Sequence, residues 1–209
     1  MSGQMNDNVN DNVNDNVNGL ERRAAMATLL ADRKDDLLVV PGLGSTCWDL
    51  AAAGDNDRNF YLWGAMGGAA MIGLGLALAQ PDKRVAVITG DGEMLMGMGA
   101  LATIGIQQPA NLAVIVFDNG HYGETGMQPS HTHQGGVDLL AVARGCGIAD
   151  CLDVRDGDAL AGLAGRLKAL SGPLFARVQI EASDPPRVLP ERDGTVLKSR
   201  FRAAIGLKA

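Results

Sequence analysis

The fold is decided by residues 84–123, RVAVITGDGEMLMGMGALATIGIQQPANLAVIVFDNGHYG. Two apolar runs of strand length, Arg84–Thr89 and Asn111–Phe117, flank an apolar segment, Glu93–Ile106, that is long enough for a helix. Because both short runs are apolar throughout rather than alternating, we expect strands that are buried on both faces of a sheet. The stretch therefore predicts a β–α–β unit with parallel strands.

The same alternation of strand-like and helix-like runs extends in both directions along the chain. Further strands are predicted at residues 37–40, 152–154 and 173–180, and further helices at residues 20–32, 47–53, 66–79, 137–145 and 158–170. Regular alternation with apolar strands is typical of a doubly wound α/β domain, in which a mainly parallel sheet carries helices on both faces. Asp118–Gly136 is predicted to be a polar loop that is too long for a simple connection.

Composition excludes several classes of protein. The chain has 209 residues, enough for one domain of ordinary size, and its 28 glycines indicate sharp turns or backbone that approaches a ligand closely. A net charge of −6 without a basic stripe argues against nucleic-acid binding. The three cysteines form no CxxC motif, so we expect reduced thiols in a cytoplasmic protein, and the polar start of the chain predicts no signal peptide.

One segment has the length of a short membrane span. Trp63–Ala79 contains 17 uncharged residues, but glycine and alanine dominate it and charged residues follow at once. We therefore expect a helix buried inside the domain, and no membrane partner.

The two ends of the chain differ in composition from the domain at residues 19–183. Residues 1–18 contain three copies of Asn-Asp-Asn-Val and are predicted to be a disordered polar tail, because the EF-hand-like pattern that begins at Asn14 has Ala25 where a calcium loop needs Glu. Residues 184–209 form a C-terminal extension that is expected to be a solvated tail or, alternatively, an anion site at a subunit boundary. Its basic residues are Arg187, Arg192, Lys198, Arg200 and Arg202.

Polar residues follow the two predicted strands that open and close the deciding stretch. Gly90-Asp91-Gly92 comes after the first strand, and Asp118-Asn119-Gly120-His121 comes after the second. Ligands of open α/β sheets bind beyond the carboxyl ends of the strands, so Asp91 and Asn119 are expected side by side at that edge. A carboxylate, an amide oxygen and a loop carbonyl suit Mg²⁺, and the flanking glycines would let N–H groups approach a diphosphate.

The spacing of these two motifs, 30 residues from Gly90 to Asn119, resembles the signature of thiamine diphosphate enzymes, which opens with GDG and closes with NN. The resemblance implies that Asp91 and the side chain of Asn119 hold Mg²⁺, with the main-chain carbonyl of His121 as the third protein ligand. The first Asn of the NN pair is Asp118 here, a position that is not expected to bind the metal.

Further cofactor contacts follow from the resemblance. Gly64-Ala65-Met66-Gly67 resembles the segment of pyruvate-decarboxylase-like enzymes in which an apolar residue, here Met66, bends the cofactor; a plain core role for Met66 is the alternative. Glu93 is expected to point away from the diphosphate or to meet a partner cation. The implied cofactor-binding residues are Gly44, Ser45, Gly64, Met66, Gly90, Asp91, Gly92, Glu93, Asn119, His121 and Tyr122.

Within this family, the chain is most similar to the phosphonopyruvate decarboxylases and the β subunits of sulfopyruvate decarboxylase, over roughly residues 35–182. The resemblance implies non-oxidative decarboxylation of a 2-oxo acid, a 3-substituted pyruvate such as sulfopyruvate or phosphonopyruvate. A carboligase of the acetolactate synthase type and a non-catalytic cofactor-binding subunit are the alternatives. The β subunit of a 2-oxoacid:ferredoxin oxidoreductase is disfavoured, since the sequence has no cysteine cluster.

The length of the chain implies a partner. Enzymes of this family are activated by a glutamate from a pyrimidine-binding domain, and a chain with both domains would be nearly twice as long. The resemblance therefore implies a separate pyrimidine-binding α subunit, in an α2β2 or larger hetero-oligomer, and no activity in this chain alone.

The loop after Asn119 carries the candidate catalytic residues. All three histidines of the chain, His121, His131 and His133, lie in it, and they could move protons or bind an anionic substrate. Glu124 lies close to the position where some decarboxylases of the family carry an active-site acid. The alternative is a mobile polar lid without a catalytic role.

Overall fold

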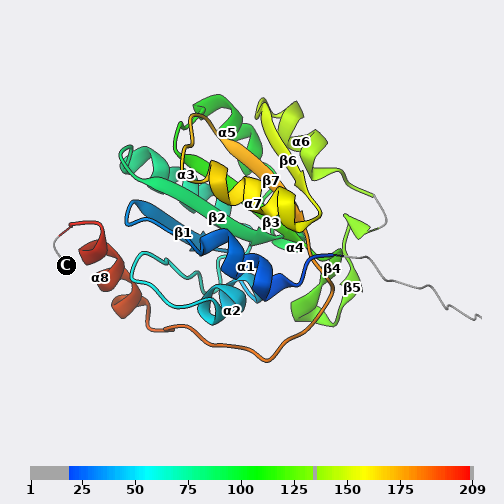
Figure 1. Ribbon diagram of the computed structural model, residues 1–209, viewed down its shortest axis with the longest axis horizontal. Helices are drawn as coiled ribbons and strands as arrows, with labels where there is room; N and C mark the ends of the chain where they lie inside the picture. The colour runs from blue at the N-terminus through cyan, green and yellow to red at the C-terminus, as the bar shows by residue number, and fades with distance from the viewer. Residues whose placement is uncertain (1–18, 134–135, 208–209) are drawn as a thin grey trace, which may run out of the picture.

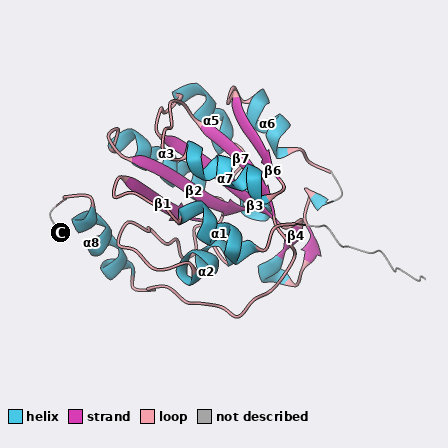
Figure 2. Ribbon diagram, in the orientation of Figure 1, coloured by secondary structure: helices cyan, strands magenta, loops and turns pink. Residues whose placement is uncertain are grey.

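Five parallel strands form the central sheet, in the order β1-β2-β3-β7-β6 (Figures 1 and 2). The strands are β1 (Leu37–Pro41), β2 (Arg84–Gly90), β3 (Leu112–Asp118), β6 (Asp150–Val154) and β7 (Leu174–Gln179). The computed structural model describes residues 19–133 and 136–207, so the predicted tail at residues 1–18 lies outside it. The predicted mainly parallel α/β fold is confirmed.

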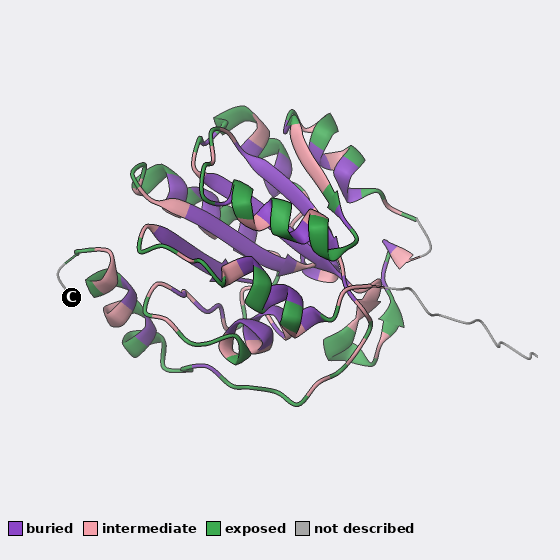
Figure 3. Cartoon of the chain, viewed as in Figure 1, coloured by how far each residue is buried: buried purple, intermediate pink, exposed green. Residues whose placement is uncertain are grey.

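Helices cover both faces of this sheet. One face carries α1 (Arg22–Leu30), α2 (Ser45–Ala52) and α7 (Gly157–Arg166); the other carries α3 (Ala69–Ala79), α4 (Asp91–Met96), α5 (Ala100–Gln107) and α6 (Leu139–Gly145). Successive residues of a strand point to opposite faces, so Val39 and Ile88 belong to the first core while Val40 and Val87 belong to the second. Both cores are buried along the strands, as Figure 3 shows.

The carboxyl ends of β1, β2 and β3 meet at one edge of the sheet. Pro41 pairs with Ile88, and Gly90 pairs with Phe117, so the three strands end at nearly the same level. The turns that follow these strands therefore leave the sheet together. This edge positions the candidate site.

Glycines explain why two of the predicted helices differ from those in the structure. The helix predicted at residues 66–79 begins only at Ala69, because Gly64 and Gly67 have φ of 87° and 82°, which a right-handed helix does not allow. The helix predicted at residues 93–106 is two helices, α4 and α5, separated at Gly97. A Cβ at Gly97 would lie 2.1 Å from the carbonyl oxygen of Gly67, so the chain breaks where two backbone segments touch.

The predicted polar loop after β3 contains a small hairpin at the carboxyl edge of the sheet. Its strands, β4 (His121–Tyr122) and β5 (Gln128–Pro129), pair in antiparallel fashion around the short 3₁₀ helix η1 (Gly123–Thr125). The hairpin brings His121 and Tyr122 back toward the start of α4, since a Cβ at Gly92 would lie 2.7 Å from the ring of Tyr122.

The C-terminal extension packs on the domain instead of forming the expected solvated tail. It crosses beside α2 (Figure 1) and ends in α8 (Gly194–Ala204), where Leu197 and Phe201, one turn apart, are buried. Arg200 donates to both carboxylate oxygens of Asp55, at 2.7 and 3.0 Å. The C-terminal extension was expected to be solvated because it is rich in basic residues, but its last part is an amphipathic helix with a buried apolar stripe.

The apolar segment that could have spanned a membrane packs inside the domain. Ala70 and Leu74 of α3 are buried in the second core. Over the described ranges, no helix is both long and apolar enough to cross a membrane. Cys47, Cys146 and Cys151 are all free thiols.

Candidate functional site

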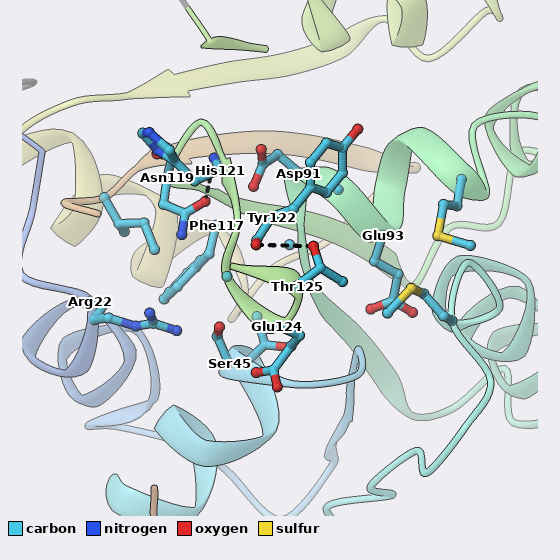
Figure 4. A pocket seen from close by; sticks show the side chains of 17 residues that line it. Arg22, Ser45, Asp91, Glu93, Phe117, Asn119, His121, Tyr122, Glu124 and Thr125 are labelled. Carbon is cyan, nitrogen blue, oxygen red and sulfur yellow. Dashed lines mark hydrogen bonds between the residues drawn. The ribbon is translucent and has the colours of Figure 1, made fainter. Parts of the chain in front are cut away.

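A cleft with an empty volume of about 630 Å³, part of it open to solvent, lies beyond the carboxyl ends of β2 and β3 (Figure 4). The cleft brings together most of the residues predicted from the sequence. Those that line it are Ser45, Met66, Gly90, Asp91, Gly92, Glu93, Asn119, His121, Tyr122 and Glu124.

Three predicted residues lie beside the cleft rather than in its lining. Gly44, with φ of 77°, backs onto the side chain of Glu124, where a Cβ would lie 2.8 Å from its Cγ. Gly64, also in the left-handed region, precedes Met66. His131 is joined to the cleft through Tyr122, whose hydroxyl lies 2.7 Å from the Nδ1 of His131.

Asp91 is the first residue of α4 and is only 2% exposed. Burial, followed by the nearby charge of Asp118, raises the pKa of Asp91 to about 6. The hydroxyl of Ser130 donates to its Oδ2 and the hydroxyl of Thr132 lies 3.1 Å from the same oxygen, and both contacts oppose this rise. Asp91 is therefore a buried carboxylate that gains from any cation placed beside it.

Asp118 holds the turn after β3. Its Oδ1 accepts hydrogen bonds from the main-chain N–H of Gly120 at 3.0 Å and from the hydroxyl of Thr132 at 2.7 Å. Asp118, which replaces the first Asn of the NN motif, therefore stabilises the turn through these hydrogen bonds. Sequence reasoning missed Ser130 and Thr132, because the pairing of a hydroxyl with a carboxylate across a loop leaves no pattern in the sequence.

The donor set fits Mg²⁺. Asp91, Asn119 and His121 line the cleft from two adjacent strand ends, and together they offer a carboxylate, an amide oxygen and a main-chain carbonyl. The Oδ1 of Asn119 accepts a hydrogen bond from the N–H of His121 at 2.9 Å, which orders this turn. Among the described residues, no cluster of three or more His, Cys, Asp or Glu side chains could hold a metal instead.

Both helices that begin at the cleft leave their first N–H groups without a side-chain cap. These are α2, which begins at Ser45, and α4, which begins at Asp91. Uncapped N–H groups at a helix start favour an anion. Two such starts in one cleft would suit an anionic group such as a diphosphate.

Glu93 extends from α4 to the turn after β1. Its Oε2 accepts a hydrogen bond from the N–H of Leu43 at 2.8 Å, and a Cβ at Gly42 would lie 1.8 Å from this oxygen. Burial raises the pKa of Glu93, and the hydrogen bonds of its carboxylate oppose the rise. The carboxylate thus meets a main-chain amide of the turn after β1; the two alternatives expected for it, pointing away from a diphosphate or meeting a partner cation, stay predictions.

Met66 stands at the rim of the cleft and is 42% exposed. The alternative of a plain core residue is therefore wrong. Met96, 63% exposed, lines the cleft beside it, and sequence reasoning missed this residue.

Glu124 is held at the mouth of the cleft by two side chains. The indole Nε1 of Trp48 donates to its Oε1 at 3.2 Å, and Arg187 of the C-terminal extension donates to its Oε2 at 3.3 Å. Two of the three histidines of the loop contact one another, since the rings of His121 and His133 lie 5.0 Å apart.

Arg22 is a further lining residue that sequence reasoning missed. Its side chain is 4% exposed, and its guanidinium donates to Asp49 at 2.7 Å and to the carbonyl of Ser183 at 2.9 Å. Burial raises the pKa of Asp49, and the charge of Arg22 opposes this. An arginine in the first turn of a helix gives no sign in the sequence that it turns inward.

Residues 46–178 match the family model described as thiamine pyrophosphate enzyme, C-terminal TPP binding domain. Phosphonopyruvate decarboxylase of Streptomyces viridochromogenes is 39% identical, over 88% of this chain and 46% of that protein. Sulfopyruvate decarboxylase subunit beta of Methanocaldococcus jannaschii is 45% identical, over 53% and 58%. The chain thus spans about half the length of these relatives.

Another sulfopyruvate decarboxylase subunit beta, from Methanothermobacter thermautotrophicus, is 36% identical over 87% of this chain and 94% of that subunit. Among solved structures, one from Mycobacterium smegmatis, assigned as a thiamin diphosphate-dependent enzyme, superposes with a TM-score of 0.66 at 25% identity. The match covers 78% of this chain and 32% of that one.

Proposed function

The chain belongs to the thiamine pyrophosphate enzymes, as their C-terminal TPP-binding domain, and on this basis we propose that it is a subunit of a non-oxidative 2-oxo acid decarboxylase that uses thiamine diphosphate and Mg²⁺. The observation that carries the proposal is the meeting of Asp91 and Asn119 in one cleft with Ser45 and Met66. Relatives named for phosphonopyruvate and sulfopyruvate support a 3-substituted pyruvate as the substrate.

The residues of the cleft divide into three tasks. Asp91, Asn119 and the carbonyl of His121 would hold Mg²⁺, and Ser45 with the first N–H groups of α2 and α4 would orient the diphosphate. Met66 would support the cofactor from the rim. When bound, thiamine diphosphate supplies the electron sink that accepts the electron pair of the bond broken as CO₂ leaves.

Proton movement would fall to the hairpin. Tyr122 lines the cleft, and its hydroxyl forms a hydrogen bond with His131, so this pair can hold a proton at the cleft and exchange it with solvent. The Nδ1 of His121 is occupied by the carbonyl of Asn119 at 2.8 Å, which leaves its Nε2 for this chemistry.

A partner subunit is part of the proposal. A pyrimidine-binding α subunit would supply the activating glutamate, in an α2β2 or larger assembly in the cytoplasm. The term "subunit beta" in the names of two relatives supports this, as does the near-complete length of one of them that the chain spans. The exposed Met66 and Met96 give such a partner an apolar rim to cover.

The test uses the chain co-purified with its pyrimidine-domain partner. Thiamine diphosphate and Mg²⁺ are added, and CO₂ is followed from a panel of 2-oxo acids, with Asp91→Ala as the matched variant. We expect CO₂ and an aldehyde from a 3-substituted pyruvate, and loss of cofactor binding in the variant. Unchanged cofactor affinity in Asp91→Ala would contradict the metal assignment.

A carboligase is the second candidate, because acetolactate synthase isozyme 1 large subunit of Escherichia coli is 28% identical over 58% of the chain. Condensation with an added aldehyde, in place of aldehyde release, would favour it. Cofactor binding without turnover of any acid would favour a non-catalytic subunit.

A further inference from the structure

Residues 181–193 form an extended strap between β7 and α8, which leads from the domain into the C-terminal extension at residues 184–209. Side chains of the domain hold it along its length: Arg22 donates to the carbonyl of Ser183, Arg23 donates to the carbonyl of Pro186, and Trp63 donates to the carbonyl of Glu191 at 3.0 Å. These three hydrogen bonds hold the strap against the domain.

The strap carries Arg187 to the mouth of the cleft. The side chain of Arg187 is 55% exposed; its guanidinium donates to Glu124 at 3.3 Å and stands 5.8 Å from the ring centre of Trp48. Glu124 lines the cleft, so Arg187 contacts a residue of the cleft lining. An exposed, single-point ion pair of this length contributes little to stability and is easily exchanged.

The charges of the cleft leave a substrate anion without a cation. The carboxylates that line it are Asp91, Glu93 and Glu124. Among the described lining residues, Arg22 is the only lysine or arginine, and it already donates to Asp49 and to Ser183. A phosphonate- or sulfonate-bearing pyruvate brings two anionic groups, so an additional cation at the mouth of the cleft would favour its binding.

We propose that Arg187 binds the phosphonate or sulfonate group of the substrate and so determines specificity for a 3-anionic 2-oxo acid. A guanidinium can offer two parallel N–H groups to the oxygens of such a group, a stronger arrangement than its present contact with Glu124. Glu124 keeps Arg187 at the mouth until the substrate anion replaces it. This inference rests on the proposed function for its choice of substrate.

Both tryptophans of the chain, Trp48 and Trp63, contact the strap, so fluorescence reports on it directly. Methylphosphonate is titrated with thiamine diphosphate and Mg²⁺ present, so that the phosphate groups of the cofactor are already bound and do not compete for the site of the probe. The complex with the partner subunit is used. We expect a saturable change that Arg187→Ala weakens about tenfold to a hundredfold.

The matched control is Arg192→Ala, a strap arginine that stacks on Trp63 at 5.7 Å and does not contact Glu124 in the structure. It should leave methylphosphonate affinity within about twofold of wild type. Equal affinity in Arg187→Ala and wild type, or no binding by wild type in calorimetry, would overturn the inference.

Kinetics separate this inference from the proposed function. In the complex, Arg187→Ala should raise the KM for the 3-anionic acid at least about tenfold with a smaller change in kcat, and Arg187→Lys should restore part of the loss. CO₂ release by Arg187→Ala with an unchanged KM would contradict the role of Arg187 and leave the proposed decarboxylase function standing. If methylphosphonate binding depends on Arg187 but no 2-oxo acid releases CO₂, the decarboxylase function is contradicted and the anion site at Arg187 is retained.

Discussion

Asp91 is a buried carboxylate whose nearest partners are two hydroxyls and whose neighbour Asp118 is a second carboxylate. Its pKa of about 6 lies above its ordinary value of 3.8, so the folded chain holds this proton more tightly than the unfolded chain does. The stabilisation is therefore full below about pH 4 and is lost as the pH rises through about 6, a change of about 3 kcal/mol.

Asp91→Asn should remove this pH dependence. Without Mg²⁺, the variant should be more stable than wild type by about 1–3 kcal/mol at pH 8, and the gain should shrink as the pH falls to 5. Urea unfolding at the two pH values measures this. A variant that is less stable at pH 8, or a gain that does not change with pH, would contradict the assigned pKa.

Some site residues could be predicted and others could not, for a physical reason. Asp91 and Asn119 follow apolar strands, and parallel strands bring their carboxyl ends to one edge, so their meeting was predictable. Arg22, Ser130 and Thr132 reach the site through side-chain contacts between distant segments. No local pattern records such contacts.

At the scale of elements, the break between α4 and α5 fixes the loop that carries Met66. Gly97 lies against the backbone of Gly67, and a Cβ would lie 2.1 Å from the carbonyl oxygen of Gly67. Apolar periodicity continues through both helices, and for this reason the sequence predicted a single helix. The break is a tertiary contact, visible only once the two segments are packed.

Gly97→Ala should displace the Met66 loop and destabilise the chain by about 1–3 kcal/mol. Thermal unfolding measures the stability, and cofactor affinity of the complex with its partner measures the loop. Gly99→Ala is the matched control, since a Cβ there meets nothing within 4 Å and the backbone of Gly99 is helical. Equal effects of the two substitutions would contradict the role given to the contact.

The anchorage of α8 belongs to the same scale. Arg200 is 19% exposed, pairs with Asp55, and stands 5.8 Å from the ring centre of Tyr61. Arg200→Ala should loosen α8 and the strap and cost about 1–3 kcal/mol. Hydrogen exchange over residues 181–205 should then increase, while Lys198→Ala, on the exposed side of α8, should leave it unchanged. No increase in Arg200→Ala would show that the buried Leu197 and Phe201 suffice.

At the scale of the whole molecule, the domain presents an open cleft that, in the proposed function, a partner subunit completes. The doubly wound fold was predictable because segments of strand length and of helix length alternate regularly along the chain and the strand segments are apolar. The course of the C-terminal extension was not, because its proline-rich part has no periodic pattern and takes its path from contacts with Arg22, Trp48 and Trp63.

The central claim is that this chain binds the diphosphate and the metal but completes an active site only with a pyrimidine-binding partner. The direct measurement is CO₂ release from a 3-anionic 2-oxo acid, with thiamine diphosphate and Mg²⁺, by this chain alone, by the partner alone and by the two mixed. The account predicts CO₂ from the mixture only. CO₂ from this chain alone, or none from the mixture with any 2-oxo acid, would contradict it.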